Sequence, residues 1–168
     1  MYAAPRRLAR WPATITWPVC VLWLLFLLSL PLANPYVHGD GVGYYAYAQS
    51  LVIDHNLNFE DDWRVANPSF LPGHDVAADG QIRPEAYTRT GHLVNHFSVG
   101  PTILWAPFLW TTHVFVRTAN SLGAQIPPDG HSRPYLVTMA MATAFYGFLG
   151  LLLAFDLARQ YAGEMWAF

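Results

Sequence analysis

Three long apolar runs alternate with polar segments along this chain. They cover residues 13–33, 98–116 and 135–155, and none of them contains Asp, Glu, Lys or Arg. A helix needs about 20 apolar residues to cross the hydrocarbon core of a bilayer. The pattern therefore predicts an all-α membrane protein with three transmembrane helices, with a large loop between the first two and a short loop between the last two.

The basic N-terminal residues 1–12 orient these predicted spans. Arg6, Arg7 and Arg10 favour a cytoplasmic N-terminus, because positively charged flanks stay on the cytoplasmic side. A secretory signal peptide fits poorly, since its apolar core runs only to about 15 residues. The expected topology has an outer, periplasmic loop at 34–97, a cytoplasmic loop at 117–134, and an outer segment at 156–168 whose last residues suggest a further span.

Composition supports a membrane protein and narrows its partners. The chain has 168 residues, of which 54% are hydrophobic and 12% charged, about half the usual charged share. A net charge of -2, with no cluster of Lys and Arg, excludes nucleic acid as an expected partner. The single cysteine, Cys20, provides neither a disulfide framework nor a cysteine-based metal site.

The outer loop opens with "DGVGYYAYAQSLVIDH", which predicts a juxtamembrane helix at 41–53. Asp40 precedes it, where its carboxylate would cap the helix by accepting backbone N–H groups. Tyr44, Tyr45 and Tyr47 cannot all face one way at 100 degrees per residue. Anchoring at the membrane surface is their simplest role, and Tyr44 and Tyr45 are also candidates for substrate binding.

The carboxylates that follow could hold a hard cation. Oxygen ligands alternate from Asp54, as in a calcium loop, but Phe59 stands where that loop needs glycine and Val65 where it needs glutamate. A calcium loop of this kind is rejected. A solvated acidic turn is the favoured interpretation, with Glu60 and Asp61 as weak candidates for a divalent cation.

The second apolar run begins with features of an anion site. Gly100 and Pro101 predict the first turn of a helix, and helix N-termini bind anions through free N–H groups. Asn95 and His96 lie just before it. These two residues and Gly100 are therefore candidates for binding an anionic substrate group, whereas a zinc site at His92 and His96 lacks a third nearby ligand.

Taken in order, these motifs resemble a known family. A basic start, one span, "GDGVGYYAYAQSLVIDHNLNFEDDW" and "NHFSVGPTILWAPFL" are similar to the N-terminal part of GT-C-type polytopic glycosyltransferases, especially bacterial members related to protein mannosyltransferases and aminoarabinose transferases. The resemblance covers residues 19–162. It implies an enzyme of the bacterial inner membrane that transfers a hexose or pentose from a polyprenyl-phosphate donor to an acceptor at the outer face.

The resemblance also assigns a role to one carboxylate. Asp40 matches the aspartate that serves these enzymes as base or metal-linked residue in the first outer loop. Many relatives have Asp-Glu where this chain has Asp40 and Gly41. Relatives also have further spans that complete the donor pocket, so we expect this chain to be the front part of a larger helical bundle, inactive alone and completed by a C-terminal part or a partner subunit.

A second interpretation comes from a different class of protein. The chain would be a non-enzymatic small membrane subunit or a transport-related scaffold, in which Asp40 only caps a helix. A transporter is expected to place ionisable residues or broken helices near the middle of the bilayer. Only His113 and Pro107 meet that description, so chemistry at the outer surface is the better supported alternative.

Overall fold

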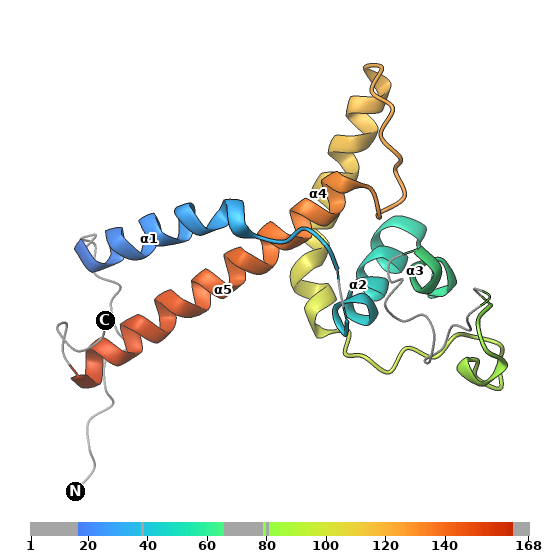
Figure 1. The fold of residues 1–168 in the computed structure, drawn as a ribbon, viewed down its shortest axis with the longest axis horizontal. Helices are drawn as coiled ribbons and strands as arrows, with labels where there is room; N and C mark the ends of the chain where they lie inside the picture. The colour runs from blue at the N-terminus through green and yellow to red at the C-terminus, as the bar shows by residue number, and fades with distance from the viewer. Residues whose placement is uncertain (1–16, 38, 66–78, 80, 163–168) are drawn as a thin grey trace, which may run out of the picture. The chain divides into compact units, whose positions relative to one another are not determined.

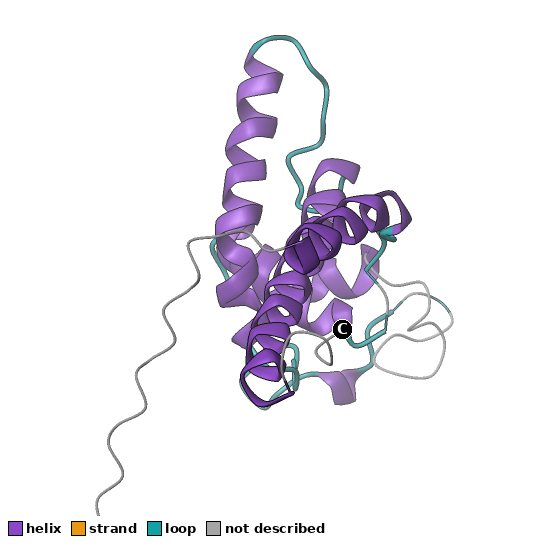
Figure 2. Cartoon of the chain, turned by 90° about the vertical axis from the view of Figure 1, so that its left-hand side faces the viewer, coloured by secondary structure: helices purple, strands orange, loops and turns teal. Residues whose placement is uncertain are grey.

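The computed structural model describes residues 17–37, 39–65, 79 and 81–162 (Figure 1). In this part of the chain every regular element is a helix, and the only β pairing is an isolated bridge between Tyr87 and Leu93 (Figure 2). The all-α class predicted from hydropathy is confirmed. The main helices are α1 (Trp17–Ser29), α2 (Gly41–Gln49), α3 (Glu60–Val65), α4 (Gly100–Ser121) and α5 (Arg133–Ala162).

The chain divides into two compact units. The first, the hairpin unit, contains Met1–Leu32 and Tyr146–Phe168, and the second, the central unit, contains Ala33–Phe145. In the hairpin unit α1 continues into the short 3-10 helix η1 (Leu30–Leu32) and packs on Phe148 of α5. Trp23 meets the Phe148 ring edge-on at 4.6 Å between centroids, and Phe26 stacks on it at 4.3 Å.

One of the described helices is long and apolar enough to cross a membrane. It comprises Arg133–Tyr161 within α5, while Trp17–Leu32 is apolar but shorter. Helix α4 covers most of the second predicted span but does not reach the same combination of length and hydropathy. Three transmembrane helices are therefore not shown. The predicted start of the first span at residues 13–16 lies outside the described residues.

Helix α2 forms the centre of the central unit. It continues as the π-helical segment η2 (Ser50–Asp54), so that helical backbone covers the residues predicted as a juxtamembrane helix. His55 ends it with a left-handed backbone, φ 55°. One face of α2 packs with α3 and the loop before α4, and the other packs with α4 and the first part of α5. The cluster on the first face includes Val42, Ala46, Phe59, Trp63 and Leu93. The cluster on the second face includes Tyr45, Ala48, Leu109, Val116, Tyr135 and Met139.

The chain after α4 turns back toward α2 (Figure 1). We call residues 122–132 the return segment. The Tyr45 hydroxyl donates to the carbonyl of Gly130, and Gln49 Nε2 donates to the carbonyl of Asp129 at 3.2 Å. His131 Nε2 lies 3.5 Å from Asp62 Oδ1.

The expected topology puts 34–97 outside and 117–134 inside. The structure brings the return segment against α2 and α3. The side of the membrane on which each segment lies stays a prediction.

Candidate functional site

Asp40 immediately precedes α2, as predicted, but it does not cap the helix. Its backbone is already helical, with φ -57° and ψ -23°, and its side chain makes no capping hydrogen bond. An N-cap residue normally has extended backbone, which aims the side-chain oxygen at the N–H groups of the first turn. The side chain is exposed. The expected structural explanation for this carboxylate is therefore wrong, and its oxygens are available to another group.

The first turn of α2 is held by the loop that leads into α4. Asn95 Nδ2 donates to the Gly43 carbonyl at 2.8 Å, and Asn95 Oδ1 accepts the N–H of Phe97 at 3.1 Å. The ring of Phe97 lies against Gly43, where a Cβ atom would stand 1.8 Å from the ring. Only glycine, which has no Cβ, allows the Phe97 ring to come this close to the backbone at residue 43. The structure thus brings two of the predicted site segments, 40–45 and 95–102, into direct contact.

The other predicted binding residues have different surroundings. Tyr44 is half-buried and meets the Phe97 ring edge-on, at 5.2 Å between centroids. His96 is exposed, with its ring 4.2 Å from that of Phe97. Gly100 begins α4 as predicted, but its N–H donates to Ser98 Oγ at 3.1 Å, so this donor already has a partner. Tyr45 is buried, and its hydroxyl is committed to the return segment.

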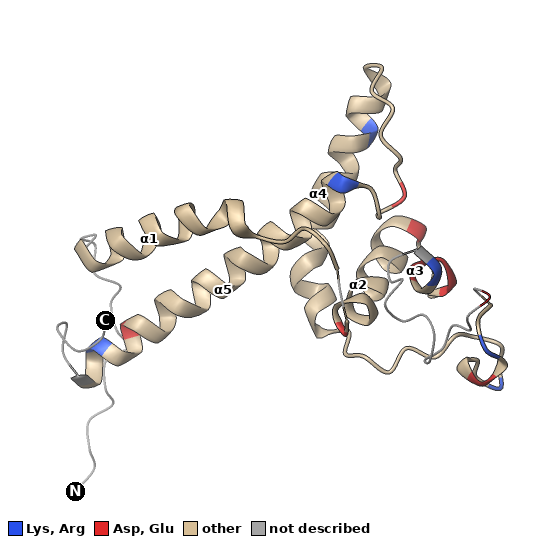
Figure 3. Ribbon diagram, in the orientation of Figure 1, with Lys and Arg blue, Asp and Glu red and all other residues tan. Residues whose placement is uncertain are grey.

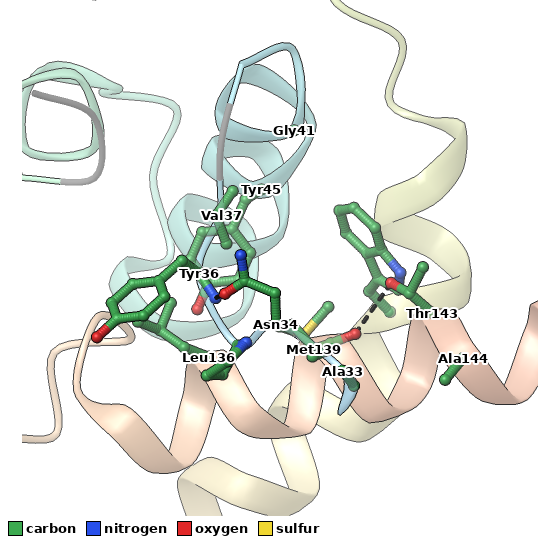
Figure 4. A pocket seen from close by; sticks show the side chains of 13 residues that line it. Ala33, Asn34, Tyr36, Val37, Gly41, Tyr45, Leu136, Met139, Thr143 and Ala144 are labelled. Carbon is green, nitrogen blue, oxygen red and sulfur yellow. Dashed lines mark hydrogen bonds between the residues drawn. The ribbon is translucent and has the colours of Figure 1, made fainter. Parts of the chain in front are cut away.

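A groove of about 440 Å³ opens beside the start of α2 (Figure 4). Its lining includes Gly41, the residue after Asp40, together with Val37 and Tyr45, and also Trp105 of α4 and Met139 of α5. Most of its lining is apolar, and no charged side chain contributes to it. Such a groove is suited to a hydrocarbon chain or another apolar group, and it places that group next to the Asp40 backbone.

Glu60 and Asp61, the weak candidates for a divalent cation, have different surroundings. Arg64 Nη2 lies 2.7 Å from Glu60 Oε1, which occupies that carboxylate one helical turn away. Asp61 is exposed. Within the described part of the chain, no group of three or more His, Cys, Asp and Glu side chains could hold a metal ion. We therefore derive no step through a divalent cation.

A second polar cluster, which the sequence reasoning missed, is buried between α2, α3 and the return segment. Asp62 is 1% exposed, and its Oδ2 accepts the Ser50 hydroxyl at 3.2 Å. Its other oxygen faces His131. Phe59, Asp62 and Trp63 are all buried, which is the i, i+3, i+4 spacing of one helical face. That spacing could have identified Asp62, because it puts this carboxylate on the apolar side of α3.

Burial controls the charge of this cluster. It raises the pKa of Asp62 to about 8, with Asp54 and Asp61 adding to the rise, while the hydrogen bond from Ser50 opposes it. Burial also lowers the pKa of His131. Three buried atoms here have no hydrogen-bond partner, namely Gln49 Oε1, Asp62 Oδ1 and His131 Nε2. The cluster joins segments far apart in sequence, and its side chains are not among those that line the groove beside α2.

Comparison with protein-family models, curated proteins and solved structures finds no match to this chain. The geometry described above and the motif resemblance are therefore what a functional proposal can rest on.

Proposed function

We propose that this chain is the N-terminal part of a membrane glycosyltransferase that moves a sugar from a polyprenyl-phosphate donor to an acceptor at the outer face. The observation that carries the proposal is the position of Asp40. It is exposed, it makes no capping bond, and it adjoins a residue that lines an apolar groove. The order of motifs resembles that of GT-C enzymes, and this resemblance is the reason for proposing a catalytic role for Asp40.

The groove and the carboxylate fit two parts of such a donor. An isoprenoid chain is apolar and would lie along Trp105 and Met139, which leaves its phosphate and sugar near the start of α2. Asp40 then accepts the proton of the acceptor hydroxyl as that oxygen attacks the anomeric carbon of the sugar. The bond from this carbon to the phosphate oxygen breaks, and the polyprenyl phosphate leaves with the bonding electron pair.

The alternative is a non-enzymatic membrane subunit or scaffold. In that interpretation Asp40 acts only as a helix cap, and the absence of a capping hydrogen bond from its side chain removes the main support for this role. A scaffold also has no evident use for an apolar groove beside an exposed carboxylate. The glycosyltransferase proposal accounts for both features.

The test uses the full-length protein in isolated membranes. We expect Asp40→Asn to lower the transfer of radiolabelled sugar from a panel of undecaprenyl-phosphate sugars by at least 100-fold, since loss of a general base typically costs 10²–10⁴-fold. Asp54→Asn is the matched control, because Asp54 is also exposed and closes the same helical stretch. Unchanged transfer by a normally inserted Asp40→Asn protein would refute the catalytic assignment.

A further inference from the structure

The start of α2 is attached to α4 and the segment before it at two consecutive carbonyl groups. Asn95 Nδ2 donates to the Gly43 carbonyl at 2.8 Å, and Thr102 Oγ1 donates to the Tyr44 carbonyl at 3.2 Å. A carbonyl oxygen has two lone pairs, so each can accept a side-chain donor in addition to a helical N–H group. Two bonds to adjacent residues limit the rotation of α2 as well as its distance from α4, which one bond alone would not do.

Asn95 is itself held by three hydrogen bonds. Besides the bond from its Nδ2 to the Gly43 carbonyl, its Oδ1 accepts the N–H of Phe97 at 3.1 Å and its backbone carbonyl accepts the Tyr47 hydroxyl at 3.0 Å. Both ends of the side-chain amide therefore have protein partners. The sequence suggests Asn95 as a ligand for an anionic group, whereas in the structure its side chain joins two segments of the protein.

Thr102 connects this attachment to the apolar groove. Its side chain is buried, with 3% exposed, and its hydroxyl donates to the Tyr44 carbonyl. Trp105, which lines the groove, is three residues further along α4 and therefore a neighbour of Thr102 on the helix surface. No Lys, Arg, Asp or Glu occurs at residues 41–53 or 100–116, so these parts of α2, η2 and α4 are tan in Figure 3. Neutral hydrogen bonds and packing therefore hold α2 beside this part of the groove.

Asp40 belongs to the turn that these bonds hold. Its carbonyl accepts the N–H of Tyr44 at 3.4 Å, and the Gly39 carbonyl accepts the N–H of Val42 at 3.1 Å. The position of Asp40 therefore follows that of Gly43 and Tyr44. A general base must lie about 2.6–3.2 Å from the group whose proton it accepts. A misplacement of about 1 Å can lower the rate by about 100-fold.

We propose that Asn95 and Thr102 are positioning residues, which set the place of the Asp40 carboxylate relative to the lipid-linked sugar in the groove. This inference rests on the proposed function, because the position of Asp40 matters only if Asp40 is the base. In this role neither side chain contacts donor or acceptor, since both act through the backbone of α2. Their loss should therefore lower kcat and leave the KM for the donor unchanged.

The test measures sugar transfer from undecaprenyl-phosphate sugars by the full-length protein in isolated membranes, per amount of inserted protein. Thr102→Val removes the hydroxyl but keeps a side chain of similar shape. Asn95→Asp keeps the acceptor for the Phe97 N–H and places an oxygen against the Gly43 carbonyl in place of the donor. We expect each variant to lower kcat by about 10- to 100-fold with an unchanged KM for the donor. Thr102→Ser keeps the hydroxyl and should retain most of the activity.

Matched controls lie further along the same helix. Thr112 is also a buried threonine, and its hydroxyl bonds to Phe108 and Thr138. The side-chain amide of Asn120 also donates and accepts, in both cases with Ile126. Thr112→Val and Asn120→Asp should therefore leave kcat unchanged. An equal loss of kcat in these controls would show a general effect on packing and would overturn the positioning role.

The same substitution in an Asp40→Asn protein separates positioning from a structural effect. A residue that acts through Asp40 has nothing left to position there, so Thr102→Val should cause no further loss of transfer. A structural effect would instead lower transfer by the same factor in both proteins, and that result, or no loss in either, would overturn the positioning role alone. Unchanged transfer by Asp40→Asn itself would refute the proposed catalytic assignment, and the positioning role with it.

Discussion

Asp62 of α3 and His131 of the return segment face each other inside the central unit, with Asp62 Oδ1 3.5 Å from His131 Nε2. They are 69 positions apart, since 131 − 62 = 69. The structure joins them in one buried cluster with Ser50, whose hydroxyl donates to Asp62. Their protonation therefore affects how firmly the return segment is held on α3.

The stability of the central unit should fall as pH rises toward 8. Asp62 has a pKa of about 8 when folded and about 4 when unfolded, so the folded state holds a proton that the unfolded state has released. The loss is at most about 1.4 kcal/mol per pH unit. His131, whose pKa is lowered, opposes this trend only below about pH 6.5, where the unfolded state takes up the extra proton. The fall in stability with rising pH should therefore be clearest between pH 6.5 and 8.

Asp62→Asn tests this prediction, because asparagine resembles the protonated carboxyl and does not titrate. Thermal unfolding in detergent, measured at several pH values, should show a shallower decline for the variant between pH 6.5 and 8. Glu85→Gln, at an exposed residue in the loop before α4, should keep the wild-type slope. Parallel slopes for wild type and Asp62→Asn would contradict the assigned pKa.

Gly43→Ala should destabilise the protein although alanine favours helices. The new Cβ would stand 1.8 Å from Cδ2 of Phe97, which is held by Tyr44 and His96, so the ring must move. Overpacking of this kind costs about 1–3 kcal/mol, against a gain of up to about 1 kcal/mol from helix propensity. We expect a net loss of about 1–2 kcal/mol in the free energy of unfolding.

Two variants make this test specific. Gly41→Ala is the control on the same helix, because its Cβ would meet only Val37 Cγ1 at 3.5 Å, an ordinary contact. It should be neutral or slightly stabilising. The double variant Gly43→Ala/Phe97→Ala should lose less than the sum of the single variants, because removing the ring removes the clash. Additive losses would show that the ring does not limit residue 43.

Local pattern predicted the parts of this structure that depend on neighbours in sequence. The helix after Asp40 was predicted from the polar residue that precedes it, and the start of α4 at Gly100 from the proline in its first turn. The cap at Asp40 was mispredicted, because residue type favours a cap but the backbone angles decide it. Capping needs extended backbone at that residue, and Asp40 is already helical.

Long-range packing explains what the sequence could not predict. Nothing near Gly130 indicates that its carbonyl meets Tyr45, or that its φ of 78° and the nearby Gln49 side chain exclude a larger residue. The apolar character of α4 was visible, but hydropathy alone does not show which side chains pack inside the protein. The structure identifies them as Thr102, Leu109, Thr112 and Val116.

Tyr45 allows a predicted binding role to be separated from a structural one. Its buried hydroxyl donates to the Gly130 carbonyl, so Tyr45→Phe should lower the free energy of unfolding by about 1–3 kcal/mol by leaving that carbonyl unpaired. Tyr44→Phe is the matched control, because the ring that packs on Phe97 is kept. In the full-length protein we expect Tyr45→Phe to lower the unfolding temperature without raising the KM for the lipid-linked donor. A raised KM with unchanged stability would instead assign Tyr45 to the substrate.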